Sequence, residues 1–214
     1  MLIAVDGPAA AGKGTLCNNL AKHFNLAKLD TGMIYRAVAK KVFETGEPIN
    51  DQVAVEVAQL LSIHDLNKSG LRDEVIGKNA SKVAAIPEVR EILLEFQRNF
   101  AKNPPSNKLG AVLDGRDIGT VVCPDANFKL YITAAPEVRA KRRYKELQER
   151  GEEAIRTAIL RDIIERDERD RTRLISPLVP ADDAHVIDTS ELGQDTVFKI
   201  ALKFITLKNE IAKN

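Results

Sequence analysis

The sequence predicts an α/β fold in which a parallel β-sheet carries helices on both faces. Short apolar runs of strand length alternate along the chain with longer segments whose apolar residues have helical spacing. The first run leads directly into a glycine-rich segment, and residues 13–24 follow it with the spacing of an amphipathic helix. The expected strands are residues 2–5, 27–29, 111–113, 128–133 and 185–187.

The composition fits a folded chain and argues against several classes of protein. Of 214 residues, 44% are hydrophobic and 29% are charged, which is enough apolar material for a buried core. The 32 basic and 31 acidic residues leave a net charge of +1, which favours neither nucleic acid nor a membrane surface as partner. The first apolar run is too short to span a membrane and lacks the flanks of a signal peptide. We therefore expect this run to be a buried parallel strand.

Cysteine and histidine are too sparse for a disulfide framework or a metal cluster. The two cysteines, Cys17 and Cys123, are far apart in the sequence, and the three histidines are scattered. We expect both thiols to be reduced and to serve as packing residues in a cytoplasmic protein.

The segment between the second and third expected strands is long. It has about eighty residues, far more than one crossover helix needs, which indicates an inserted subdomain. Its last part, Asn103-Pro104-Pro105-Ser106-Asn107, is expected to be the linker that returns the chain to the sheet.

The glycine-rich segment GPAAAGKGT has the pattern of a phosphate-binding loop. Where a strand, G-x-x-x-x-G-K and a helix follow one another, backbone N–H groups and the helix N-terminus converge on a phosphate, and Lys13 reaches the β and γ phosphates. Glycine is needed because side chains would block this approach. The alternative, a turn that merely packs a helix on a strand, is less consistent with the flanking elements. The expected ATP-binding residues are Gly7, Pro8, Ala9, Ala10, Ala11, Gly12, Lys13, Gly14 and Thr15.

Two further polar segments follow expected strands. Thr31 and Arg36 come after the second strand, and Asp114 comes directly after the third. Ligands of open α/β sheets bind at the carboxyl edge, so these residues should lie beside the glycine-rich loop. Asp114 is placed to orient Mg²⁺ through water, and Thr15 is the expected direct ligand.

Arginine is concentrated late in the chain. Ten of the fifteen arginines, with nine acidic residues, fall between Arg139 and Arg173. The i, i+4 spacing puts Arg139 and Arg143 on one helix face, and Arg166, Asp170 and Arg173 share another. A mobile lid bearing arginines would supply the cations that phosphoryl transfer needs and would exclude water. Salt bridges within a helical hairpin are the alternative, which we expect at Arg150, Arg156, Arg161 and Arg169.

Six segments together resemble bacterial cytidylate kinases, in the order of that family and over nearly the whole chain. They are GPAAAGKGT, LDTGMIYR, ASKVAAIPEVR, LDGRDIGTVVCPDA, RDERDRTR and SPLVPADDAHVIDTS. The form G-K-G-T, with Gly14 after the lysine and then Thr15, is similar to nucleoside monophosphate kinases in general. The resemblance implies a P-loop nucleoside monophosphate kinase fold with a five-stranded parallel sheet, a monophosphate-binding insert and a helical lid. It implies transfer of the ATP γ-phosphate to CMP or dCMP, with Mg²⁺ as cofactor, by a monomer whose partners are small-molecule nucleotides.

The resemblance also assigns roles to residues that match the family's motifs. Thr31, Arg36 and Arg116 would hold the acceptor and its phosphate. Ser81, Arg90 and Asp117 would face the cytosine. Arg166 and Asp170 would contact the ribose, with Arg173 close to the acceptor. The implied catalytic residues are Lys13, Arg116, Arg139, Arg143 and Arg173.

The implied domain boundaries are residues 1–35, 108–138 and 175–214 for the core, 36–107 for the insert and 139–174 for the lid. Between residues 61 and 81 the insert is shorter than in the family, which carries extra hairpin strands here. We therefore expect the small sheet of the insert to be reduced or absent, and we assign His64 and Asp65, inside this segment, to structure.

Two alternatives remain open from the sequence. One is a P-loop kinase of another acceptor, such as UMP, AMP or shikimate, which the base-facing residues Ser81, Arg90 and Asp117 would distinguish. The other is a nucleotide-binding regulatory module without transferase activity. A module of that kind would bind one nucleotide, whereas the arginine sets imply two nucleotide sites.

Overall fold

The chain folds into two units, and each is described by itself. The computed structural model describes residues 1–46 and 50–211. The first unit contains residues 1–29 and 104–214, and the second contains residues 30–103.

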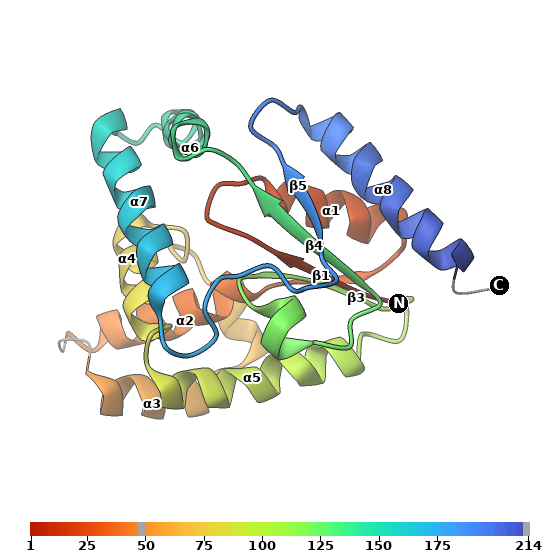
Figure 1. Cartoon of the computed structure of the whole chain (residues 1–214). Coiled ribbons are helices and arrows are strands. Elements are labelled where there is room, and N and C mark those ends of the chain that lie inside the picture. The colour runs from red at the N-terminus through yellow and green to blue at the C-terminus, as the bar shows by residue number, and fades with distance from the viewer. Residues whose placement is uncertain (47–49, 212–214) are drawn as a thin grey trace. The chain divides into compact units, whose positions relative to one another are not determined.

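A five-stranded sheet forms the centre of the first unit (Figure 1). Its order is β2-β3-β1-β4-β5, and β1 pairs in parallel with β3 on one side and with β4 on the other. Each expected strand is confirmed and ends at its expected residue or one or two residues later, so the α/β fold class is correct. The strands are β1 (Leu2–Asp6), β2 (Ala27–Asp30), β3 (Ala111–Gly115), β4 (Phe128–Thr133) and β5 (His185–Asp188).

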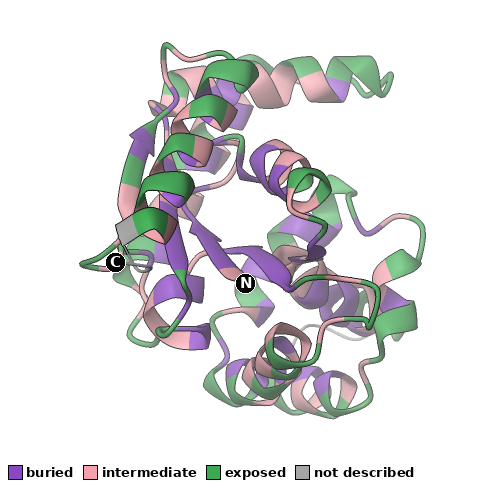
Figure 2. Ribbon diagram, turned by 90° about the vertical axis from the view of Figure 1, so that its right-hand side faces the viewer, coloured by how far each residue is buried: buried purple, intermediate pink, exposed green. Residues whose placement is uncertain are grey.

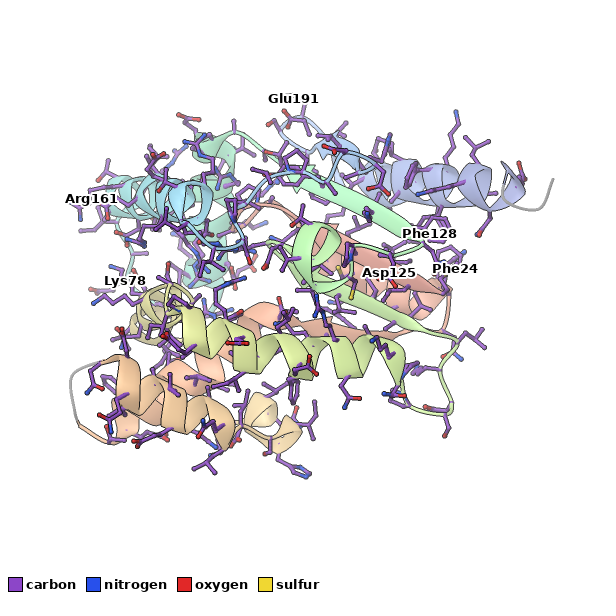
Figure 3. The ribbon with its side chains drawn as sticks, turned by 60° about the horizontal axis from the view of Figure 1, so that its bottom comes forward. Phe24, Lys78, Asp125, Phe128, Arg161 and Glu191 are labelled. Carbon is purple, nitrogen blue, oxygen red and sulfur yellow. The ribbon has the colours of Figure 1, made fainter. Side chains whose placement is uncertain are left out.

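Apolar residues from alternate strand positions form the core of this unit (Figure 2). Ile3 and Val5 of β1 are fully buried with Leu20 of α1 and Ile205 of α8. Phe128 belongs to the same cluster and Phe24 packs against it (Figure 3). The helices of this unit are α1 (Lys13–His23), α6 (Pro136–Glu149), α7 (Arg156–Thr172) and α8 (Gln194–Ile211), with one turn of π-helix, η2 (Ile118–Val122).

Helices α6 and α7 pack on each other through a small apolar cluster of their own. It consists of Ala140, Leu147, Ile159 and Ile163. The outer side of this pair carries charged residues, and the exposed Arg161 pairs with Glu165 (Figure 3). The salt bridges that we expected within the hairpin are confirmed at this arginine and at Arg150, which pairs with Glu146.

Helices make up the second unit. Its elements are α2 (Thr31–Glu44), α3 (Asp51–Gln59), the 3₁₀-helix η1 (Ile63–Asn67), α4 (Glu74–Val83) and α5 (Pro87–Lys102). All residues from 50 to 103 are described and none of them is in a strand, which confirms the expected loss of the small sheet.

Asp65 has the structural role that we expected. It is buried and accepts hydrogen bonds from the backbone N–H and hydroxyl of Ser62, at 2.9 and 3.1 Å, which caps η1. Burial acts to raise the pKa of Asp65, but its bonds to Lys41, Ser62 and Lys68 outweigh that and hold the pKa well below its usual range. The carboxylate therefore joins α2 to the shortened segment.

Within residues 1–46 and 50–211 there is no group of three or more His, Cys, Asp and Glu that could hold a metal ion. Among the helices in these ranges, none combines the length and the apolar character needed to cross a membrane. Cys17 and Cys123 are both buried, as expected of packing residues.

Candidate nucleotide site

The glycine-rich loop lies between β1 and α1, at the carboxyl end of the central strand. In this order β3 and β2 lie on one side of β1, and β4 and β5 lie on the other, which is the point where open α/β sheets bind ligands. Gly7 has φ +143°, and a Cβ there would stand 1.9 Å from the Ile132 carbonyl oxygen. The loop can therefore leave β1 along this path because residue 7 has no side chain.

Lys13 is held inside this loop. Its side chain is buried, its Nζ donates to the Pro8 carbonyl at 2.8 Å, and Asp114 Oδ1 lies 3.9 Å away. Asp114 also approaches Gly14, where a Cβ would be 3.6 Å from Oδ2. The structure thus brings together the loop, its lysine and the acidic residue of the third strand, as the sequence predicted. Asp114 and the Thr15 hydroxyl in the first turn of α1 supply the oxygen atoms that Mg²⁺ prefers.

Arg139 and Arg143 occupy different surroundings, although their spacing predicted one shared face. Arg139 is 2% exposed, donates to the carbonyls of Ala134 at 2.8 Å and Ala9 at 3.3 Å, and forms a bidentate pair with Asp167. Arg143 pairs with Glu146 at 2.9 Å within α6. Arg139 therefore lies against the glycine-rich loop.

Arg142 and Thr189 also contact the glycine-rich loop and were not predicted from the sequence. The Arg142 guanidinium donates to the Thr189 hydroxyl at 2.9 Å, to the Thr189 carbonyl at 2.6 Å and to the Ala11 carbonyl at 3.5 Å. Arg142 is three residues after Arg139, and this i, i+3 spacing was a signal that the two share a helix face. Thr189 directly follows β5, so it lies at the same edge of the sheet as the loop.

The segment after β3 and the end of α7 form a second cluster of charges. Arg116 Nε lies 3.1 Å from Asp170 Oδ2, and Arg166 Nε lies 3.8 Å from the same oxygen. Arg173 Nη2 lies 3.7 Å from Asp117 Oδ1. Burial acts to raise the pKa of Asp170, but the three arginines around it outweigh that and lower the pKa. These five residues were predicted as substrate contacts, and the structure brings them into two ion-paired groups.

Asp6 was also missed by the sequence analysis. Its carboxylate is buried at the end of β1 and accepts the backbone N–H groups of Ile118 at 2.8 Å and Gly119 at 2.7 Å. Burial raises the pKa of Asp6 to about 6, against the lowering effect of these two hydrogen bonds. A charged residue at the end of an apolar strand was the signal available in the sequence.

In the second unit, the predicted residues Thr31 and Arg36 belong to α2. Thr31 is buried in the first turn. The Arg36 guanidinium donates to the carbonyls of Leu71 at 2.8 Å and Asp73 at 3.4 Å, and lies against Gly77 of α4. A Cβ at Gly77 would stand 2.8 Å from Arg36 Nη2, so the guanidinium fits here because residue 77 has no side chain.

Ser81 on α4 and Arg90 on α5 are both buried within the second unit. The Ser81 hydroxyl has no hydrogen-bond partner among the residues that the structure describes. Arg90 donates to the Ala84 carbonyl at 3.2 Å, and its guanidinium lies 5.6 Å from the centre of the Tyr35 ring.

This fold and this loop define a P-loop protein of the α/β class, with a buried lysine and an acidic strand end at the phosphate site. The family model described as cytidylate kinase matches residues 3–207. The chain belongs to the cytidylate kinase family.

Relatives named cytidylate kinase are similar over almost their full length. The protein from Paramagnetospirillum magneticum is 55% identical over 97% of this chain and 98% of its own. Those from Methylocella silvestris and Brucella ovis are 50% and 51% identical over 96% and 95% of this chain, and 94% and 92% of their own. A solved structure of an uncharacterized protein from Eubacterium ventriosum has a TM-score of 0.54 at 14% identity, covering 96% of this chain and 98% of that one, which reflects a shared fold.

Proposed function

We propose that the protein is a cytidylate kinase that transfers the γ-phosphate of ATP to CMP or dCMP. A phosphate oxygen of CMP bonds to the γ-phosphorus while the bond to the β–γ bridging oxygen breaks, so the products are ADP and CDP. The observation that carries this proposal is family membership over residues 3–207, together with a loop that holds a buried lysine beside an acidic strand end.

The loop is proposed to bind the donor. Its backbone N–H groups and the N-terminus of α1 would face the β and γ phosphates, and Lys13 would move from the Pro8 carbonyl to a phosphate oxygen. The Thr15 hydroxyl would hold Mg²⁺ directly and Asp114 would hold it through water. Mg²⁺ supplies neutralisation of the phosphate charge.

The reaction needs no general base from the protein. The second pKa of a phosphate monoester is about 6, so the attacking oxygen is largely ionised at neutral pH. The protein then contributes in-line positioning and electrostatic stabilisation. We propose that the arginines which stabilise the transferring group are Arg116, Arg139, Arg143 and Arg173.

The acceptor contacts are proposals for individual residues. Thr31 and Arg36 would hold the CMP phosphate region with Arg116. Ser81, Arg90 and Asp117 would read the base. The unpartnered Ser81 hydroxyl in the described structure supports a ligand contact, because buried polar groups normally find a partner. Arg166 and Asp170 would contact the ribose, with Arg173 close to the acceptor.

The ion pairs of Asp170 and of Asp117 are compatible with these proposed contacts. Asp170 has a lowered pKa and stays ionised at neutral pH, so it can accept hydrogen bonds from ribose hydroxyls. Asp117 and Arg173 form an ion pair at 3.7 Å, so the proposed base contact of Asp117 lies beside a positive charge.

A panel of acceptors tests the proposed function. ADP release from ATP would be measured in a coupled assay with CMP, dCMP, UMP, AMP and shikimate. We expect turnover with CMP and dCMP to exceed that with the other acceptors by at least about tenfold in kcat/KM. Preference for UMP, AMP or shikimate would identify another P-loop kinase, and slow hydrolysis of ATP without dependence on any acceptor would identify a regulatory module.

We also propose that the protein acts in the cytoplasm as a monomer with nucleotides as partners. The near-neutral charge of +1 supports the absence of nucleic-acid binding. Sedimentation of the purified protein at several concentrations would test the monomer, and a dimer at micromolar concentration would contradict it.

A further inference from the structure

Several backbone carbonyls of the glycine-rich loop accept hydrogen bonds from side chains, most of which belong to other elements. The Pro8 carbonyl accepts from Lys13 at 2.8 Å, and the Ala9 carbonyl accepts from Arg139 at 3.3 Å. The Ala11 carbonyl accepts from the Thr189 hydroxyl at 3.0 Å and from Arg142 at 3.5 Å. The contact to Ala11 joins the loop to the end of β5 and to α6, which lie far from it in the sequence.

Thr189 directs its hydroxyl proton to the loop. The residue is 2% exposed, and its hydroxyl has two carbonyl oxygens in reach, those of Ala11 at 3.0 Å and Thr133 at 3.1 Å. The Thr133 carbonyl already accepts the Thr189 backbone N–H at 2.8 Å. A hydroxyl has one proton to donate. The other donor to the Ala11 carbonyl is Arg142, at the longer distance of 3.5 Å, so this carbonyl gains more from the hydroxyl proton than the Thr133 carbonyl does.

Arg142 fixes the orientation of that hydroxyl. One guanidinium nitrogen donates to the hydroxyl oxygen at 2.9 Å, and the other donates to the carbonyl of the same residue at 2.6 Å. Because an arginine cannot accept a hydrogen bond, the Thr189 hydroxyl must use its lone pair toward Arg142 and its proton elsewhere. The planar fork thereby aims the proton away from α6.

Holding the Ala11 carbonyl also orients the next N–H group. The peptide bond is planar and trans, so the carbonyl of Ala11 and the N–H of Gly12 point in opposite directions from one rigid group. Gly12 has φ +99° and no side chain, and no neighbouring atom lies within 4 Å of the place where its Cβ would be. A hydrogen bond on the carbonyl is therefore an effective way to keep the N–H in one orientation.

We propose that Thr189 and Arg142 are positioning residues for the phosphate donor. Through the Ala11 carbonyl they hold the Gly12 N–H toward the phosphates of a nucleoside triphosphate, so they act on the affinity for ATP and not on the affinity for CMP. This inference rests on the proposed function of the loop as the ATP site. It adds to that function two residues that touch the loop and are not themselves assigned to either substrate.

The first test removes the hydroxyl and keeps its shape. Thr189→Val replaces the hydroxyl by a methyl group, and Thr189→Ser keeps the hydroxyl. Binding of ATP would be measured by calorimetry, and the KM values for ATP and CMP by the coupled assay. For Thr189→Val we expect about tenfold weaker ATP binding, the effect of losing one buried hydrogen bond, and a KM for CMP within about twofold of wild type. Thr189→Ser should restore most of the ATP affinity.

Two further variants control for general effects of the substitutions. Thr196→Val makes the same change at an exposed position of α8, and should leave both substrates unaffected. Arg142→Lys keeps the charge and loses the fork, so it should weaken ATP binding as Thr189→Val does. Arg150→Lys, at the exposed end of α6, is its matched control. If Thr189→Val does not fold, the pair Arg142→Lys and Arg150→Lys decides the question.

The outcomes separate this inference from the proposed function. Unchanged ATP affinity in both Thr189→Val and Arg142→Lys would overturn the inference. Equal losses of affinity for ATP and CMP, with no rescue by Thr189→Ser, would also overturn it, because that pattern indicates structural support of the whole unit. Absence of CMP-dependent ADP release in the wild-type protein would overturn the proposed function instead, while the ATP affinities would still test the two residues.

Discussion

Lys13 is a long side chain that the loop holds in place. A buried ammonium group is costly unless it is paired, and here the Pro8 carbonyl at 2.8 Å and Asp114 at 3.9 Å provide partners. The lysine therefore lies beside the N-terminus of α1 in an ordered conformation. A donor phosphate would replace the carbonyl as its partner at little entropic cost.

We expect Lys13→Met to reduce kcat by at least about a hundredfold, because it removes a cation from the transferring phosphates. Methionine has a similar volume, so the fold should persist. The free energy of unfolding should fall by about 1–3 kcal/mol, because Asp114 loses the nearby positive charge. Steady-state kinetics and urea unfolding would measure both effects. Lys22→Met, at an exposed position of the same helix, is the control. Turnover near that of wild type would show that GPAAAGKGT is not the donor loop.

Asp117 is expected to recognise the base because its carboxylate can accept hydrogen bonds but cannot donate them. An ionised carboxylate accepts hydrogen bonds, which suits the amino group of cytosine and opposes the carbonyl at the same position of uracil. The mismatch should cost about 1–3 kcal/mol. We therefore expect Asp117→Asn to lower the ratio of kcat/KM for CMP over UMP by about tenfold or more, mainly through loss of CMP activity.

Asp125→Asn is the matched control for this measurement. Asp125 is exposed in the same segment that follows β3 (Figure 3). It should leave the ratio unchanged. If the ratio is also unchanged in Asp117→Asn, then Asp117 serves to pair with Arg173 and does not read the base.

The sequence located some site residues and missed others for a physical reason. Lys13 and Asp114 are recognisable because Lys13 follows β1 through the glycine-rich loop and Asp114 lies near the end of β3, so local order predicts where they lie. Asp6, Arg142 and Thr189 depend on partners that are far away in the chain: Asp6 bonds to the backbone of Gly119, and Thr189 bonds to that of Ala11. Contacts of this kind follow from tertiary folding, so the local signals at Asp6 and Arg142 could not identify their partners.

At the scale of elements, α4 is adapted to the arginine of α2. Glycine is normally unfavourable inside a helix, by about 1 kcal/mol relative to alanine. Gly77 is nevertheless in the middle of α4, where a Cβ would stand 2.8 Å from the Arg36 guanidinium. Glycine lowers the helix propensity of α4, but it leaves the space in which Arg36 reaches the Leu71 carbonyl.

Gly77→Ala should separate stability from activity. We expect the free energy of unfolding to stay the same or to rise by up to about 1 kcal/mol, because alanine favours the helix. The guanidinium must move, so the KM for CMP should rise about three- to tenfold if Arg36 holds the acceptor phosphate. Gly193→Ala, where a Cβ meets nothing within 4 Å, is the control. A KM equal to that of wild type would remove Arg36 from the proposed acceptor contacts.

The strands were easier to predict than the roles of the arginine helices. A buried parallel strand is a continuous apolar run, so Phe128–Thr133 could be read directly from the sequence. For α6, spacing identifies which arginines share a face but not what that face meets. Arg139 turned out to be bonded to the glycine-rich loop and Asp167, whereas Arg143 pairs within its own helix. The expectation that α6 and α7 form a mobile lid stays a prediction.

For the whole molecule, Asp6 makes stability depend on pH. Its pKa is raised by burial from 3.8 to about 6, so between these values the folded protein binds more protons than the unfolded chain. The contribution of Asp6 is therefore fully present below about pH 4 and is lost as the pH rises through 6. The shift corresponds to about 3 kcal/mol.

A comparison with Asp6→Asn isolates this effect from those of other acids. Urea unfolding of both proteins would be measured from pH 4 to pH 7. The variant loses a hydrogen-bond acceptor and should be less stable throughout, but it cannot titrate. We expect the stability of wild type relative to the variant to fall by up to about 3 kcal/mol as the pH rises from 4 to above 6. A difference that does not change with pH would show that Asp6 has an ordinary pKa.

The order in which the chain is synthesised has a consequence for β1. Leu2 pairs with Ala111, and Ile3 pairs with Phe128, so each partner is made more than a hundred residues later. At about 5–20 residues per second, β1 waits roughly 5–20 s before it gains a neighbour. Residues 30–103 are translated in that interval and form a contiguous unit that can bury its own apolar side chains first. A nascent chain that ends before β3 therefore contains an apolar strand that has neither of its neighbours in the sheet.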